Sequence, residues 1–206
     1  MSTAVPDPRR WITLAVVVVA ALIVVLDNSV LTVAIPTILR DFDTTLPAVE
    51  WVITGYALTF ASLLIIGGRL ADVFGQRRIF IIGAALFGGG SLLAALSWNI
   101  PSLIVGEAII EGIGASLMLP TTLSIISTTF HGRERATAFG AKFVLSLGVA
   151  ALGVPLVAYI YNATGDFYWL FIVLAALAGT IVLSALALPR EEPRPAPVVV
   201  AQKAGV

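Results

Sequence analysis

The chain has 206 residues, of which 59% are hydrophobic and only 12% are charged, and its mean hydropathy is +1.02. Soluble domains of this size carry about a quarter charged residues, so the composition excludes a water-soluble protein and predicts several membrane spans. The basic and acidic residues balance at 12 each, which gives no indication of nucleic-acid binding. The absence of cysteine excludes disulfides, thiol catalysis and cysteine-ligated metals.

Residues 1–10 are polar and contain two prolines, so we expect a disordered cytoplasmic tail. An apolar run begins at Trp11. Charge followed by a valine-rich run is also typical of a signal peptide, but this run continues past Asp27 to about Ile38. About 28 residues are too many for a signal core and enough for a tilted span. We therefore expect an uncleaved first helix over residues 11–39.

Five further apolar runs follow, separated by short polar links. They predict helices over residues 51–70, 78–98, 102–130, 136–161 and 168–188. Pro120 predicts a kink in the fourth helix, and the three glycines 88–90 predict close packing of the third helix. The predicted fold is an all-α membrane protein with a six-helix transmembrane domain over residues 11–189. Residues 190–206, rich in proline and charge at their start, are expected to be a disordered cytoplasmic tail.

Basic residues and tryptophans support the six spans. Eleven of the twelve lysines and arginines fall on or near one side of the predicted bundle, and only Arg40 falls on the other. This asymmetry predicts a multi-pass protein of the cell membrane with both termini in the cytoplasm. The eleven are Arg9, Arg10, Arg69, Arg77, Arg78, Arg133, Arg135, Lys142, Arg190, Arg194 and Lys203. The tryptophans lie at predicted span ends, as in an aromatic belt: Trp11, Trp51, Trp98 and Trp169.

Three acidic residues, Asp27, Glu107 and Glu111, lie inside predicted spans. An ionisable residue within a span is costly and usually faces a cavity or a partner. Asp27 lies 16 residues after Trp11, which is about 24 Å along a helix. Glu107 and Glu111 are four residues apart and share a helix face. Two carboxylates that close do not both ionise readily in a low dielectric, which suits them to bind and release a proton.

These acids, together with the adjacent Asn28, predict a site of proton coupling or cation recognition. For Asp27 the alternative is a structural role, hydrogen-bonded to Asn28 or to the backbone, and Glu107 alternatively reaches the outer interface. The single histidine, His131, lies in a predicted loop, which excludes a histidine-based metal site or a Ser–His pair within the membrane. We expect no metal site and no cofactor. An enzyme is not expected. The lack of a Walker sequence indicates that ATP is not the direct energy source, and we expect the proton gradient to supply the energy.

The link between the second and third helices, residues 68–78, is short and charged. Gly68 and Gly75 allow close helix approach and positive φ. Arg77 and Arg78 place the link on the cytoplasmic side, and Asp72 is placed to cap a helix N-terminus. The simplest interpretation is a positive-inside turn.

This link resembles the signature loop between helices 2 and 3 of the major facilitator superfamily, roughly G-x-L-a-D-r-x-G-r-r-r. Val73 and Gln76 stand where that family usually has a basic residue. Residues 26–36, LDNSVLTVAIP, resemble the helix 1 motif L-D-x-T-V-V-N-V-A-L-P of its 14-helix drug–proton antiporter branch.

The fourth predicted helix is similar to the helix 4 motif of that branch, R-x-x-Q-G-x-G-a-a, with two departures. Ala108 replaces the arginine and Glu111 replaces the glutamine, so the usual intramembrane cation is missing. Residues 139–189 look more like the last two helices of a full-length facilitator. This raises the hypothesis of an internal deletion or fusion that joins four N-terminal helices to two C-terminal ones.

The resemblance implies one half of a facilitator, built as a 3+3 inverted repeat, in which residues 68–78 take part in gating. It also implies that helices 1 and 4 line the central cavity. A lone half would then carry its acids on an exposed face and need a homodimer partner or a separate second half to shield them from lipid. The implied function is proton-coupled efflux of small amphipathic or cationic compounds; the alternative is a truncated, non-transporting membrane protein or assembly partner.

Overall fold

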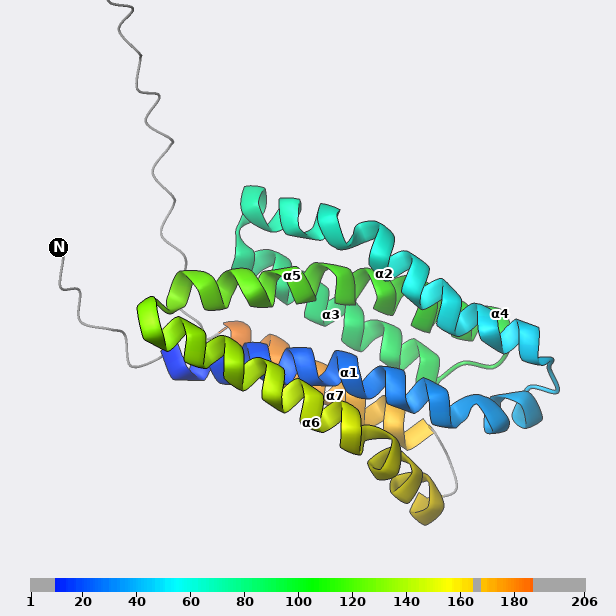
Figure 1. Ribbon diagram of the computed structural model, residues 1–206. Helices are drawn as coiled ribbons and strands as arrows, with labels where there is room; N and C mark the ends of the chain where they lie inside the picture. Colours follow the sequence, from blue (N-terminus) through cyan, green and yellow to red (C-terminus); the bar gives the residue numbers. More distant parts are fainter. Residues whose placement is uncertain (1–9, 165–167, 187–206) are drawn as a thin grey trace, which may run out of the picture.

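The computed structural model describes residues 10–164 and 168–186, and within them the regular structure is helical (Figure 1). The elements are α1 (Arg10–Asp41), α2 (Leu46–Phe74), α3 (Gln76–Ala95), α4 (Ile100–Leu103), η1 (Ile104–Glu111), α5 (Gly112–Thr129), α6 (Gly132–Thr164) and α7 (Tyr168–Leu186). The π-helical segment η1 joins α4 to α5 without a break, and we name these three elements together the fourth span. Six helices among the described residues are thus long and apolar enough to cross a membrane, as the hydropathy predicts.

Several helices extend beyond their hydropathic limits. α2 continues to Phe74 and α3 starts at Gln76, so Gly75 alone joins them, and the predicted link over residues 68–78 is mostly helical. Polar residues end an apolar run without ending a helix, because they are compatible with helical backbone. Gly75 has a φ of 96°, in the left-handed region that glycine adopts without strain. The turn predicted there is therefore a single residue.

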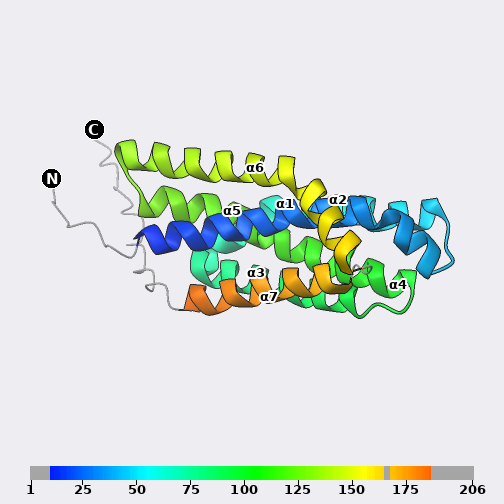
Figure 2. The same ribbon diagram turned by 90° about the horizontal axis from the view of Figure 1, so that it is seen from below.

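The six spans form three packed pairs (Figures 1 and 2). In an inverted repeat the first, second and third spans correspond to the fourth, fifth and sixth, and replacing every span by its counterpart gives the same three pairs. α1 lies along α6, and α2 lies along the fourth span. α3 packs against α7, a pair that the exchange maps onto itself. This pattern is the one that a 3+3 inverted repeat produces, and it confirms the predicted fold.

α3 and the fourth span approach until their backbones touch. A Cβ atom added to Gly90 would lie 2.7 Å from the carbonyl oxygen of Gly106 and 2.8 Å from the backbone nitrogen of Glu111. Only glycine fits such a crossing, and the small residues predicted to serve close packing in residues 88–90 do so at Gly90. Gly89, by contrast, has open space around it.

The fourth span contains an irregularity that the sequence does not indicate. Pro120 lies inside α5, as predicted, but the π-helical hydrogen bonding is in η1, which ends at Glu111, nine residues earlier. Insertions of this kind occur frequently at functional sites. The irregular turn includes both acidic residues of this span.

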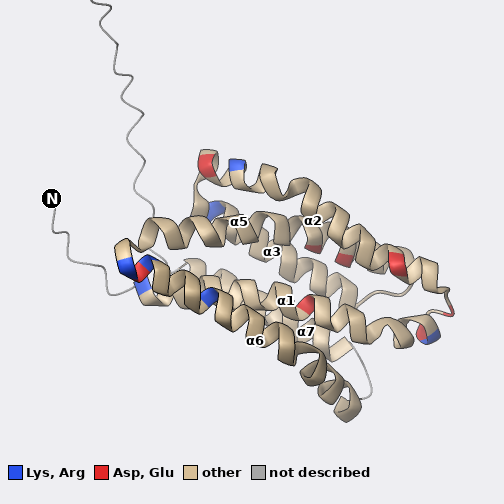
Figure 3. Cartoon of the chain, in the orientation of Figure 1, with Lys and Arg blue, Asp and Glu red and all other residues tan. Residues whose placement is uncertain are grey.

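Charged residues are distributed unevenly between the two ends of the bundle. Basic residues gather where α1 and α6 begin, and Arg40 lies in the last turn of α1 at the other end (Figure 3). Arg10 forms a 3.0 Å ion pair with Glu134, which joins the starts of α1 and α6. The four tryptophans are exposed and lie at or near helix ends. The tails predicted over 1–10 and 190–206 lie outside the described residues, apart from Arg10.

Candidate ion-coupling site

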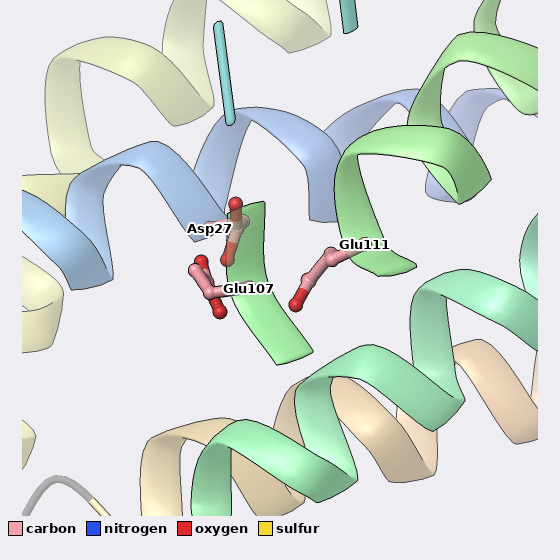
Figure 4. A group of neighbouring side chains, drawn as sticks. All are labelled: Asp27, Glu107 and Glu111. Carbon is pink, nitrogen blue, oxygen red and sulfur yellow. The ribbon is translucent and has the colours of Figure 1, made fainter. Parts of the chain in front are cut away.

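Three acidic side chains from two spans meet inside the bundle (Figure 4). Asp27 comes from α1, and Glu107 and Glu111 come from η1. All three are 0% exposed, and one carboxylate oxygen from each lies within 4.8 Å of those from the other two. The sequence predicts these residues as one site, and the fold brings them together.

The carboxylates have few hydrogen-bond donors. The Ser91 hydroxyl on α3 donates to Glu111 Oε1 at 2.8 Å and lies 3.1 Å from the carbonyl oxygen of Phe87. Both oxygens of Asp27, both of Glu107 and Oε2 of Glu111 are buried without a hydrogen-bond partner from outside the cluster. A buried ion without compensation is too costly to persist, so the cluster must hold protons or a cation.

A tyrosine from α2 completes the surroundings of the acids. Tyr56 is buried, its phenol lies within electrostatic range of all three carboxylates, and its hydroxyl interacts with the Asn28 side chain. Sequence reasoning missed both Tyr56 and Ser91. Each is a weakly polar residue in a mostly apolar span, and only its position opposite an acid in the folded bundle distinguishes it.

The expectation that a lone half carries these acids on an exposed face is wrong. The side chains are fully buried because α2 and α3 pack against η1 and contribute Tyr56 and Ser91 to the same interior. Glu107 therefore does not reach the outer interface. The six spans shield the three carboxylates without any second body.

Asn28 lies beside the acids rather than among them, and its side chain interacts with Tyr56. Asn28 is exposed, and its amide donates to the carbonyl oxygen of Val24 at 2.9 Å. The structural alternative for Asp27, a hydrogen bond to Asn28 or to the backbone, is also not found, since neither carboxylate oxygen has a hydrogen-bond partner from outside the cluster.

Lys142 is a buried cation that sequence reasoning assigned to the basic end of the bundle. It lies within α6, is 7% exposed, and its Nζ donates to the Thr122 hydroxyl at 2.9 Å. Thr122 follows Glu111 by eleven residues, about 16 Å along the helix, so Lys142 is separate from the acids. An intramembrane cation is thus present, on a different helix from the one where the resemblance places it.

The residues predicted for the gating loop have distinct surroundings. Arg77 donates to the carbonyl oxygens of Ala185 and Leu186 and so caps the end of α7. Asp72 and Arg78 are exposed, and no side chain caps the start of α3, so the capping role predicted for Asp72 is not observed.

Gly68 makes only ordinary contact with Pro120. The close approach occurs one residue earlier, where an added Cβ on Gly67 would collide with the carbonyl oxygen of Ser116.

The six apolar spans, their paired packing and the buried acids define a multi-pass helical membrane protein with the half-bundle of a secondary transporter. The family model described as Major Facilitator Superfamily matches residues 17–205, and the chain belongs to this superfamily. A solved structure, the proton:xylose symporter XylE bound to 6-bromo-6-deoxy-D-glucose, shares the fold with a TM-score of 0.69 at 18% identity. That similarity covers 87% of this chain and 45% of XylE.

The curated relatives include antibiotic resistance and export proteins. The puromycin resistance protein of Streptomyces alboniger is 40% identical over 187 residues, which cover 90% of this chain and 37% of that protein. The methylenomycin A resistance protein of Bacillus subtilis is 36% identical and covers 84% of this chain and 37% of its own length. The probable actinorhodin transporter of Streptomyces coelicolor is 37% identical, and the similarity covers 74% of this chain and 26% of that transporter.

The chain therefore spans between about a quarter and little more than a third of the length of these relatives. They confirm the predicted superfamily, whose members are transporters rather than enzymes. An alignment of 187 residues must also extend past the fourth span, which ends at Thr129, into the last two helices. The fusion of N-terminal and C-terminal helices stays a hypothesis.

Proposed function

We propose that this protein takes part in proton-coupled efflux of small amphipathic or cationic compounds. The observation that supports the proposal is the meeting of Asp27, Glu107 and Glu111, all fully buried, within one facilitator half-bundle. The names of several relatives, which describe resistance to or export of antibiotics, agree with export as the direction.

Protons are the coupling ions that this cluster suits. Three carboxylates in a water-poor interior repel one another, so the fully ionised cluster is unstable and protonation relieves it. Movement of α1 relative to the fourth span would change how the acids share their protons, since Asp27 and the two glutamates lie on different elements. Alternating access in this fold is a relative rocking of two six-helix halves, and we propose that it is accompanied by such a movement within this half. Asn28, exposed on the same helix as Asp27, is proposed to contact the substrate.

The gating role of the junction between α2 and α3 is part of the same proposal. Gly75 joins the two helices, and Arg77 connects the junction to the end of α7. Gly68, Asp72 and Arg78 flank this connection. A rotation of α2 would therefore be passed to α3 and α7 at the basic end, which we propose is cytoplasmic.

Transport measurements in proteoliposomes test the coupling. The purified chain is reconstituted, a proton gradient is imposed, and movement of a fluorescent cationic dye is followed. Asp27→Asn and Glu111→Gln, which keep side-chain shape but cannot ionise, should each abolish gradient-driven dye movement. Glu50→Gln removes an exposed carboxylate and serves as the matched control. Undiminished dye movement in both acidic-cluster variants would refute proton coupling through these residues.

We further propose that a second half completes the transport path, either as a second copy or as a separate chain. The bundle corresponds to 45% of XylE, and α2 and α6 present broad exposed apolar surfaces. Residues such as Leu58, Ile65 and Leu147 face lipid or a partner there. Cross-linking in native membranes, followed by mass determination, tests this. A strictly monomeric species would favour the alternative, a non-transporting membrane protein.

A further inference from the structure

We propose that Asp27, Glu107, Glu111 and the Tyr56 hydroxyl form a binding site for a dehydrated hard metal cation of the Ca²⁺ type. The absence of cysteine and the loop position of the single histidine exclude soft-ligand sites, but they do not bear on a site made of oxygen atoms. The inference rests on the proposed ion coupling and deepens it, because the metal would occupy the place of the coupling protons.

The spacing of the acids allows all three to contact one ion. Ca²⁺ binds oxygen ligands at about 2.3–2.6 Å, so ligands on opposite sides of the ion lie about 4.6–5.2 Å apart. One oxygen from each of the three acids lies within 4.8 Å of the others. The separation of these oxygens is therefore compatible with one Ca²⁺ shared by Asp27, Glu107 and Glu111.

The number of buried oxygen atoms also matches. Five carboxylate oxygens of the cluster are buried without a hydrogen-bond partner outside it. The Tyr56 hydroxyl, from a different helix, is a sixth buried oxygen and lies within electrostatic range of all three acids. Ca²⁺ takes six to eight oxygen ligands in flexible geometry, whereas Mg²⁺ dehydrates reluctantly and keeps several waters. A compact interior that offers only protein oxygens therefore favours Ca²⁺.

Charge balance determines how metal and protons exchange. A cluster with all three carboxyls protonated is neutral; binding Ca²⁺ while two carboxyls ionise leaves it neutral again and releases two protons. Metal binding should thus weaken as the proton concentration rises. Among the described residues, the titratable groups that interact with the cluster are its own three carboxyls and Tyr56. No basic side chain is among them to take the place of the metal.

Calorimetry of the full chain tests the site without requiring transport. The protein is placed in nanodiscs of phosphatidylcholine, which carries no net charge, and titrated with CaCl₂ at pH 7 and pH 8 in two buffers of different ionisation enthalpy. We expect one saturable site, release of about two protons per Ca²⁺, and an affinity up to about 100-fold higher at pH 8. MgCl₂ should bind more weakly than CaCl₂.

Variants assign the binding to the cluster. Asp27→Asn and Glu111→Gln should abolish saturable Ca²⁺ binding, Tyr56→Phe should weaken it about tenfold or more, and Glu50→Gln should leave it unchanged. Circular dichroism checks that each variant is folded, and Ca²⁺ should raise the melting temperature of the unmodified chain but not that of Asp27→Asn.

Absence of Ca²⁺ binding at pH 8, binding retained in both acidic-cluster variants, or tighter binding of Mg²⁺ would each overturn the inference. Dye export without Ca²⁺ binding would remove the metal site and leave the proposed function standing. Ca²⁺ binding without dye movement would refute the proposed function and leave the metal site standing.

Discussion

The contact between α3 and the fourth span predicts a large difference between two adjacent glycines. In Gly90→Ala the new methyl group would lie 2.7–2.9 Å from atoms of Gly106 and Glu111, closer than real Cβ contacts allow. Two of these atoms belong to the backbone, so relief requires the helices to separate. Overpacking of this kind costs about 1–3 kcal/mol. The same separation would displace Glu111 from the cluster.

Gly89→Ala is the matched control, because it lies on the same helix and an added Cβ has no neighbour within 4 Å. Both substitutions gain the same intrinsic helix preference of alanine, up to about 1 kcal/mol, which cancels in the comparison. At about 2–4 °C per kcal/mol, Gly90→Ala should melt about 2–12 °C below Gly89→Ala. Thermal unfolding in detergent, followed by circular dichroism, measures this. Equal melting temperatures would show that the backbones do not touch at Gly90.

Three further predictions concern Ser91, Arg77 and the orientation of the bundle. Ser91→Ala removes the hydroxyl that donates to Glu111 Oε1 and should lower stability by about 1–3 kcal/mol; an unchanged melting temperature would contradict the role of that bond. Arg77→Ala should speed hydrogen–deuterium exchange in the last turn of α7, because it removes the cap, whereas Arg78→Ala should not; equal exchange in the two variants would argue against capping. In this cysteine-free chain, Thr45→Cys and His131→Cys should be labelled by an impermeant reagent from opposite sides of the membrane, with His131→Cys reached only from the cytoplasm; labelling of both from one side would contradict the predicted orientation.

The fold was largely predictable because its strongest determinant is hydropathy. Six long apolar runs suffice to place six spans, and the motif around Gly75 suffices to indicate the superfamily. Helix ends were less accessible to sequence reasoning, since a helix does not stop where apolar residues stop. Residues 46–50, which include Pro47, were expected to be loop but form the first turn of α2.

The candidate site was predictable in its acids and not in its surroundings. Asp27, Glu107 and Glu111 are conspicuous because ionisable residues are rare in spans. Their complete burial, and the contributions of Tyr56 and Ser91, depend on which face of α2 and α3 turns toward η1. The nearly all-apolar composition of these helices leaves that rotation unmarked in the sequence. The π-helical turn is likewise invisible to residue periodicity.

The lengths of the connections differ between the two ends of the bundle. At the basic end one residue, Gly75, joins α2 to α3, and two residues join α5 to α6. At the other end four residues, 42–45, separate α1 from α2, and four more, 96–99, separate α3 from α4. The basic end therefore has almost no slack in these connections. If the helices tilt against one another, we expect the smaller displacement there and the larger one at the end that carries Arg40.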